Sequence, residues 1–161
     1  KGQKMSLFLL TLLSLIWDIA SCFRLAPIKR VLVVGASRGI GLGLVNRYAA
    51  DGWQVHATTR TLDALGALGN VSGDLKIHQL DVTDSNQIRS LADLFRDKPI
   101  DVVIHNAGVK DRSRKETRLV NVEAPFAVVE SLLPAVAISE EKKVVLISSS
   151  LGSREKYGGG E

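Results

Sequence analysis

The segment from Val31 to Gly41 constrains the fold of this chain more than any other. It reads Val-Leu-Val-Val-Gly-Ala-Ser-Arg-Gly-Ile-Gly. The apolar residues at its start, most of them β-branched, predict a short buried strand. Gly35, Gly39 and Gly41 then form a turn that leads into an amphipathic helix. A strand, a glycine turn and a helix in this order predict a site for the phosphates of a dinucleotide.

The three glycines have different tasks in such a turn. Gly35 allows a sharp turn off the strand, Gly39 lets the backbone approach a pyrophosphate, and Gly41 lets the helix pack against the strand. The first turn of the helix presents free N–H groups and its positive dipole end to the phosphates. The expected cofactor contacts of this turn are Gly35, Ser37, Arg38, Gly39, Ile40 and Gly41.

Apolar runs alternate with helical patterns from residue 31 onward. The runs predict strands at 31–34, 54–59, 75–80, 101–105 and 143–148. Helices are expected at 40–51, 62–68, 85–96 and 116–136, with a polar loop at 110–115. We expect Gly52 to end the first helix and Asp84 to cap the third, while Pro125 and Pro134 kink or shorten the last. Strands alternating with helices predict an α/β fold, a Rossmann-like doubly wound parallel sheet of order 3-2-1-4-5, truncated after the fifth strand.

Residues 1–28 differ from the rest of the chain. The apolar run at 7–17 is too short for a membrane-spanning helix, which needs ~20 residues. It is similar to a signal-peptide core, and residues 19–22 resemble a lipoprotein cleavage box. An extension packed on the domain, or an upstream stretch translated in frame before Met5, are the alternatives. We therefore divide the chain into a hydrophobic leader or N-terminal extension at 1–28 and a nucleotide-binding domain at 29–161, incomplete at its C-terminus.

Composition narrows the class of partner. The net charge is +4, but the basic residues form no run with interleaved aromatics, which argues against nucleic acid and for a phosphorylated small molecule. Cys22 is the only cysteine, and His56, His78 and His105 lack metal-ligand spacing, so we predict no metal site. We expect a cytoplasmic protein; the alternative is a protein exported or membrane-anchored through residues 5–22.

The end of the second strand selects the cofactor. An acid there binds the ribose of NAD, whereas an arginine accommodates the 2′-phosphate of NADP. This chain has Ala57-Thr58-Thr59-Arg60 and no acid, and Arg38 adds a second guanidinium. Guanidinium groups bind phosphate oxygens in a forked geometry. The sequence therefore favours NADP over NAD.

Four motifs in order resemble those of the short-chain dehydrogenase/reductase family. They are Gly-Ala-Ser-Arg-Gly-Ile-Gly at 35–41, Asp81-Val82, Asn106-Ala107-Gly108 and Ser148-Ser149-Ser150. The ending, at 151–153 and 157–160, is similar to the C-factor-like subgroup. The resemblance covers about residues 29–161. It implies an oxidoreductase that transfers a hydride between a nicotinamide cofactor and the carbonyl or alcohol carbon of a small molecule.

The resemblance also implies roles for single residues. Asp81 would bond the adenine amino group and Val82 would lie against the ring. Asn106, Ala107 and Gly108 would hold the sheet near the adenine and ribose. The catalytic residues would be Asn121, which anchors a water in a proton relay, and Ser149, which orients the substrate. In the alternative interpretation Asp81 caps a strand end, Asn106 and Gly108 make a tight turn, and Asn121 is an ordinary helix residue.

The catalytic pair Tyr-x-x-x-Lys of the family is absent from the 161 residues. Tyr157 comes too early, and Glu161 stands where the lysine would be; a carboxylate there would raise the phenol pKa rather than lower it. The spacing from Asn106 to Asn121 is also shorter than usual in the family. We predict an NADP-dependent short-chain oxidoreductase of which this chain is an inactive fragment. The alternative is a non-catalytic NADP-binding or sensor protein; residues following Glu161 would discriminate. A homo-oligomer is a further expectation for the full-length form, and membrane contact only if the leader is retained.

Overall fold

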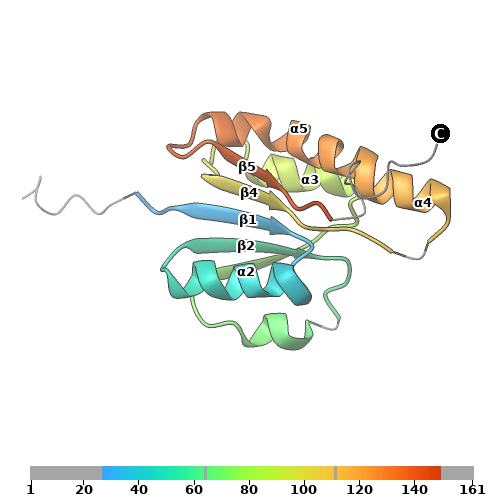
Figure 1. Ribbon diagram of the computed structural model, residues 1–161. Coiled ribbons are helices and arrows are strands. Elements are labelled where there is room, and N and C mark those ends of the chain that lie inside the picture. Colours follow the sequence, from blue (N-terminus) through green and yellow to red (C-terminus); the bar gives the residue numbers. More distant parts are fainter. Residues whose placement is uncertain (1–26, 64, 111, 150–161) are drawn as a thin grey trace, which may run out of the picture.

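The computed structural model describes residues 27–63, 65–110 and 112–149. It contains a five-stranded parallel sheet with the order β3-β2-β1-β4-β5 (Figure 1). The strands are β1 (Arg30–Val34), β2 (Gln54–Thr59), β3 (Leu75–Gln79), β4 (Val102–His105) and β5 (Lys143–Leu146). The helices are α2 (Gly39–Ala50), η1 (Gly66–Asn70), α3 (Ser85–Leu94), α4 (Arg114–Arg118), η2 (Leu119–Glu123) and α5 (Ala124–Ala137). The predicted strand order and fold class are confirmed.

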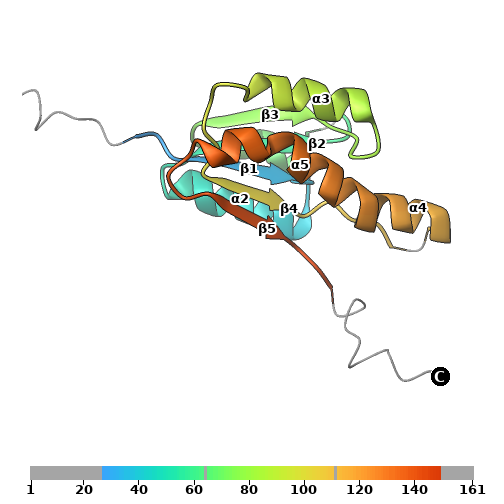
Figure 2. The same cartoon turned by 90° about the horizontal axis from the view of Figure 1, so that it is seen from above.

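Helices cover both faces of the sheet. Seen from above, α3 and α5 lie on one side of the strands and α2 on the other (Figure 2). Side chains alternate along β1, so Leu32 and Val34 pack under α3 and α5, while Val31 and Val33 pack under α2. All four are fully buried. Burial of both faces explains why the strand reads as an unbroken apolar run.

The predicted helix ends are confirmed at two places. The Asp84 side chain accepts hydrogen bonds from the backbone N–H groups of Asn86 and Gln87, so it is the N-cap of α3. Asp51 is the C-cap of α2, and Gly52 follows it with a φ of +78°, as expected for a glycine that ends a helix.

The prediction of a helix at 62–68 is wrong. The structure has instead a short 3₁₀ helix, η1, from Gly66 to Asn70, whose buried anchor is Leu68. Gly66, the first residue of η1, has a φ of +52°, so a right-handed helix cannot run through it from Leu62, and Gly69 adds little helix propensity. The two glycines thus confine the helical turn to this short piece.

The helix expected at 116–136 begins earlier and is irregular. Ser113 and Glu116 form a capping box, so α4 starts at Arg114, inside the segment expected to be a loop. A π-helical turn, η2, then joins α4 to α5, with the Ala124 N–H donating to the Leu119 carbonyl. Pro125 has no N–H and cannot form the next α-helical hydrogen bond, which explains the irregular turn before it.

The other proline of this stretch leaves the helix intact. Pro134 lies inside α5, which continues to Ala137. By length and composition, Arg114–Ala137 is the one stretch of the described residues that could cross a membrane. Val128 and Leu132 of this stretch are buried in the core, as expected of a helix that packs on a sheet.

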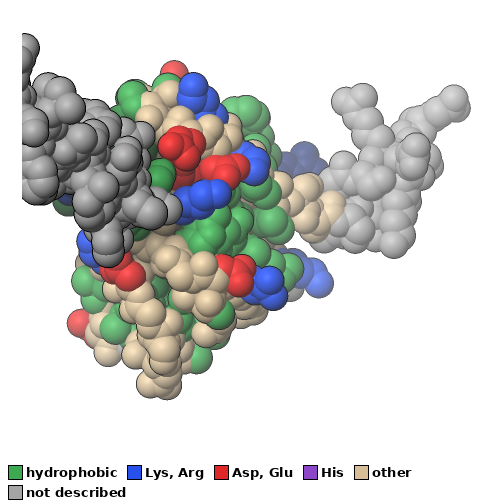
Figure 3. All heavy atoms as spheres, turned by 90° about the vertical axis from the view of Figure 1, so that its left-hand side faces the viewer, with side chains coloured by type: hydrophobic (Ala, Val, Ile, Leu, Met, Phe, Trp, Pro, Cys, Tyr) green, Lys and Arg blue, Asp and Glu red, His purple; other side chains and the backbone are tan. Residues whose placement is uncertain are grey.

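Charged residues join the first and last strands where they begin. Glu141 forms ion pairs with Lys29 at 2.8 Å and with Lys143. These two ammonium groups, Lys143 first, lower the pKa of Glu141 to about 2. Viewed onto this end of the sheet, acidic and basic side chains lie next to each other (Figure 3). The arrangement fixes the chain entering β1 against the chain entering β5.

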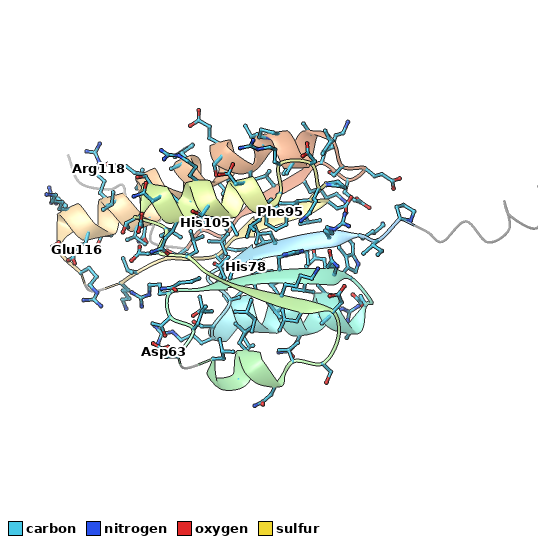
Figure 4. All side chains as sticks on the ribbon, turned by 180° about the vertical axis from the view of Figure 1, so that it is seen from behind. Asp63, His78, Phe95, His105, Glu116 and Arg118 are labelled. Carbon is cyan, nitrogen blue, oxygen red and sulfur yellow. The ribbon has the colours of Figure 1, made fainter. Side chains whose placement is uncertain are left out.

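The three histidines lie in strands, as the sequence predicts. His56 Nδ1 and His78 Nε2 are 2.8 Å apart, and the ring centroids are 5.1 Å apart with planes within 8°. The rings are thus joined end to end by one N–H···N hydrogen bond between β2 and β3. Phe95 packs edge-on against both (Figure 4). His105 is 2% exposed, and its Nε2 has no hydrogen-bond partner among the described residues.

Stability should fall as the pH drops below 6.5. Burial lowers the pKa of His56 to about 4, with the neighbouring His78 as the second cause, and burial also lowers that of His105 to about 4. The unfolded chain then binds protons more readily than the folded one, so the free energy of unfolding decreases from pH 6.5 toward pH 4. Urea unfolding at several pH values between about 7 and 5, above the ordinary range of carboxyl groups, measures this.

The variant His56→Gln removes one of the titrating groups, and we expect a shallower fall in the same pH range. A free energy of unfolding that stays constant across this range in the unmodified protein would contradict the assignment of buried neutral histidines.

Candidate functional site

The turn between β1 and α2 has the backbone geometry that its glycines predict. Gly35 and Gly39 have φ values of +81° and +57°, in the left-handed region that favours glycine. The Gly35 N–H donates to Thr58 Oγ1 at 3.1 Å, and the Ala36 N–H donates to the Thr58 carbonyl at 2.9 Å. The end of β2 therefore holds the start of the turn in place.

The turn also approaches the end of β4 very closely. A Cβ atom at Gly35 would lie 2.7 Å from Ala107 Cα, and one at Gly41 would lie 2.2 Å from the Gly35 carbonyl oxygen. Asn106 Nδ2 donates to that same oxygen at 2.8 Å. A Cβ at Gly39, in contrast, would have no atom within 4 Å. The turn is thus tight behind Gly35 and Gly41 and open in front of Gly39, which fits a group as bulky as a pyrophosphate.

A cleft of about 880 Å³ opens beyond the carboxyl ends of β1 to β4. It lies where the strand order reverses between β1 and β4, the usual ligand position in such sheets. Its wall includes nine predicted residues: Gly35, Ser37, Arg38, Arg60, Asp81, Val82, Asn106, Ala107 and Gly108. The remaining residues of the turn lie beside it, because Gly39 and Ile40 are exposed on the first turn of α2 and Gly41 is buried behind the turn.

Cations outnumber anions in the cleft. Its wall carries four basic side chains and two acidic ones: Arg38, Arg60, Lys110, Arg112, Asp81 and Glu116. Within the described part of the chain, none of the four cations forms an ion pair. The cleft is therefore suited to an anionic ligand.

Asp81 is ionised, and one of its two carboxylate oxygens is already hydrogen-bonded within the chain. Its Oδ1 accepts hydrogen bonds from the Thr83 N–H at 2.9 Å and from Thr83 Oγ1 at 2.7 Å. These bonds, with a smaller contribution from the charge of Arg60, lower the pKa of Asp81. The Asp81 N–H donates to Gln87 Oε1 at 2.8 Å, so α3 also fixes this position. Both the capping role and a ligand role through Oδ2 are compatible with this geometry.

Asn121 ties the irregular helix to the loop after β4. Its Oδ1 accepts from the Val109 N–H at 2.9 Å, and its Nδ2 donates to the Val109 carbonyl at 2.9 Å. This pair of bonds is more specific than the contacts of an ordinary helix asparagine. Asn121 is thus brought to the β4 end of the cleft, one residue beyond Gly108.

Ser149 follows the end of β5. The pairing of β5 with β4 extends one residue past the strand, because the Ile147 N–H donates to the His105 carbonyl at 2.9 Å. Ser149 is not among the residues that line the cleft. Residues 1–26 of the leader lie outside the described residues. So do Ser150, Tyr157 and the ending similar to the C-factor-like subgroup.

The structure adds residues that the motifs did not indicate. They are Thr58, Thr59, Thr61, Leu80, Thr83, Val109, Lys110, Arg112, Glu116, Leu119 and Val120. Thr83 follows Asp81 by two residues, a turn pattern visible in the sequence. Thr58, Thr59, Thr61 and Leu80 lie at or just after the carboxyl ends of β2 and β3. The remaining residues come from the connection after β4 and from the helix that follows it, and Glu116 lies on α4 beyond the carboxyl ends of the strands (Figure 4).

Residues 29–160 match the family model of the short-chain dehydrogenases. The chain belongs to this family. Among curated relatives of this short-chain dehydrogenase, short-chain dehydrogenase/reductase 1 of Saponaria officinalis is 26% identical, with 87% of this chain and 59% of the relative covered. The 3-oxoacyl-[acyl-carrier-protein] reductase of Escherichia coli is 27% identical, over 78% of this chain and 56% of the relative.

Solved structures agree with this assignment. A short-chain dehydrogenase/reductase from Burkholderia multivorans with bound NADP is 28% identical, has a TM-score of 0.69, and is matched over 83% of this chain and 64% of that one. A second short-chain alcohol dehydrogenase from Burkholderia multivorans has a TM-score of 0.68 at 27% identity, over 82% and 67% of the two chains. The short-chain dehydrogenase described here spans between 30% and 59% of the length of the first curated relatives that it matches.

Two glycines of α2 provide a matched test of the turn. In Gly41→Ala the new methyl group would collide with the Gly35 carbonyl, so we expect a loss of about 1–3 kcal/mol in the free energy of unfolding. Gly43 is exposed and has open space around its Cβ position, so Gly43→Ala should stabilise the helix by about 0.5–1 kcal/mol. Urea unfolding of both variants measures the difference; equal effects would show that the turn does not approach α2 as closely as described.

Proposed function

We propose that the protein is an NADP-dependent oxidoreductase that interconverts a carbonyl and an alcohol on a small molecule. The observation that carries this proposal is the pairing of Arg38 and Arg60 in one cleft with the glycine turn. Neither arginine has an ion-pair partner in the described part of the chain, and the end of β2 offers no acid to a ribose. Two free guanidinium groups suit the 2′-phosphate that distinguishes NADP from NAD.

The cofactor would be held by backbone and side-chain groups of the cleft. The N–H groups at the start of α2 would bind the pyrophosphate, since this helix has no side-chain cap and no acid in its first turn. Asp81 would bond the adenine amino group through its free oxygen, and Val82 and Ala107 would pack against the ring. NADP-bound relatives of similar structure support this assignment.

When bound, the reduced nicotinamide supplies the hydride for the carbonyl carbon, and a proton must reach the carbonyl oxygen. Ser149 would orient that oxygen from the end of β5. Asn121 would anchor a water for proton transfer, and its bonds to Val109 hold it at the β4 end of the cleft. The tyrosine and lysine that deliver the proton in the family are absent from the 161 residues.

A non-catalytic NADP-binding or sensor protein is the second candidate, because the same cleft would hold the dinucleotide without turning it over. In both cases the partner is a small molecule rather than nucleic acid, and we propose a cytoplasmic location. A homo-oligomer of the full-length form would use the outer side of α4 to α5, where Val122, Phe126 and Leu133 are 52%, 67% and 48% exposed.

The variant Arg60→Ala tests the NADP assignment. Loss of one charged hydrogen-bonding group costs about 1.5–3 kcal/mol, so NADP affinity should fall about ten- to a hundredfold while NAD affinity stays constant. Isothermal titration calorimetry with both dinucleotides measures this. The control Arg89→Ala removes an exposed arginine of α3 outside the cleft and should change neither affinity. Equal losses for NADP and NAD would contradict the role.

Binding and turnover should separate in this chain. Because no tyrosine–lysine pair is present to supply the proton, residues 1–161 should bind NADPH without oxidising it in the presence of ketones or aldehydes. Loss of the absorbance of the reduced nicotinamide monitors turnover, and a parallel titration monitors binding. Turnover of any carbonyl compound would overturn the inactive-fragment part of the proposal; absence of binding would overturn the function itself.

A further inference from the structure

The first turn of α3 carries a glutamine that does not cap its own helix in the usual way. Asp84 is the N-cap and Gln87 is the third residue of the helix, a spacing typical of a capping box. In a capping box the glutamine oxygen accepts a hydrogen bond from the N-cap N–H. Here the Asp84 N–H donates instead to the Asp81 carbonyl at 3.0 Å. The oxygen of Gln87 is therefore available to another donor.

That donor is the backbone N–H of Asp81, three residues before the N-cap. Gln87 Oε1 accepts from it at 2.8 Å, and Gln87 Nε2 donates to Asp84 Oδ2 at 3.0 Å. One orientation of the side-chain amide satisfies both bonds, because an N–H needs an acceptor and a carboxylate needs a donor. Asp81 thus has its N–H bound by Gln87 and its carbonyl bound by Asp84, so the start of α3 holds both of its backbone polar groups.

The carboxylate of Asp81 is restricted as well. Its Oδ1 accepts two hydrogen bonds from Thr83, which also lower its pKa. Its Oδ2 has no hydrogen-bond or ion-pair partner among the residues that the structure describes. An ionised carboxylate can only accept hydrogen bonds. The cleft wall therefore carries, at Asp81, one unused acceptor oxygen on a backbone that is fixed on both sides.

Gln87 acts on the cleft only through this aspartate. The residues from Leu80 to Thr83 line the cleft, and Gln87 does not. Core packing keeps the two segments together, because Val82 and Ile88 are each 8% exposed and belong to the same apolar cluster. A side chain behind the wall thus determines where an acceptor on the wall lies.

We propose that Gln87 is a positioning residue that makes the cleft selective for adenine over a base with a carbonyl in place of the amino group. The proposal rests on the proposed function, in which Asp81 binds the adenine amino group. A fixed acceptor oxygen pairs with an amino N–H, but it opposes a carbonyl oxygen without any hydrogen bond. An Asp81 released from Gln87 would be able to turn toward the ring N–H beside that carbonyl, and the selectivity would fall.

The first experiment measures base preference with NADP and its hypoxanthine analogue, in which a carbonyl replaces the adenine amino group. Isothermal titration calorimetry of the unmodified chain should show NADP binding about ten- to a hundredfold more tightly, the factor expected for one charged hydrogen bond. In Gln87→Ala this ratio of affinities should fall about tenfold or more. Alanine has the highest helix propensity and Asp84 remains the N-cap, so we expect α3 to form in this variant.

Two further variants separate positioning from a general effect on α3. Asn86 is the exposed neighbour of Gln87, it does not line the cleft, and Asn86→Ala should leave the ratio unchanged. Gln87→Glu keeps an oxygen that accepts from the Asp81 N–H, and its added charge acts on both dinucleotides alike, so it should retain the preference. Equal weakening of both dinucleotides in Gln87→Ala, the same loss of preference in Asn86→Ala, or equal affinities in the unmodified chain would overturn the proposal.

The second experiment needs no dinucleotide. Hydrogen exchange followed by NMR should show that the Asp81 N–H of the ligand-free chain exchanges about two- to tenfold faster in Gln87→Ala, because one neutral hydrogen bond is lost. An unchanged rate would overturn the positioning role whether or not a cofactor binds. If the unmodified chain binds neither dinucleotide, the proposed function itself fails; a missing preference with NADP still bound rejects only the role of Gln87.

Discussion

The contact on which the site depends is the approach of the glycine turn to the end of β4. The Gly35 carbonyl accepts from Asn106, and no side chain fits between Gly35 and Ala107 or between Gly41 and Gly35. This contact brings together segments that are 71 residues apart in the chain. It fixes the switch point of the sheet, and the cleft opens directly above it. The ligand position thus follows from backbone packing before any charged residue is considered.

Much of the fold could be predicted because local signals and tertiary packing agree. β1 and β4 are continuous apolar runs, and the sheet buries both of their faces. The predictions of helix boundaries fail where the backbone chemistry of a single residue determines the local structure. At Gly66 a positive φ prevents the expected helix, and before Pro125 a missing N–H converts a regular turn into a π turn. Apolar periodicity contains no information on either effect.

The candidate site could be predicted where a motif and its structural reason coincide. Arg60 directly follows β2 and Asp81 comes two residues after β3, so both lie at the carboxyl edge of the sheet, where ligands bind in such folds. Thr58 was missed because its role depends on the pairing of β2 with β1, which places it beside Gly35. Lys110 and Arg112 were missed for another reason: exposed cations in a loop have no pattern of their own, and only the fold shows that they face a cleft.

Asn121 is a residue whose family motif could be read from the sequence but whose contacts appear only in the fold. The family resemblance assigns it to proton transfer, and in the structure its side-chain oxygen and nitrogen both hydrogen-bond to the backbone of Val109. By holding the N–H and the carbonyl of Val109, the Asn121 side chain sets the path of the loop that leads to Lys110. Asn121 lies inside the π turn η2, whose wider helical turn shifts the register at this position. Pro125 therefore influences the cleft without touching it: by removing one N–H it fixes where the helix is irregular, and hence where Asn121 meets the loop.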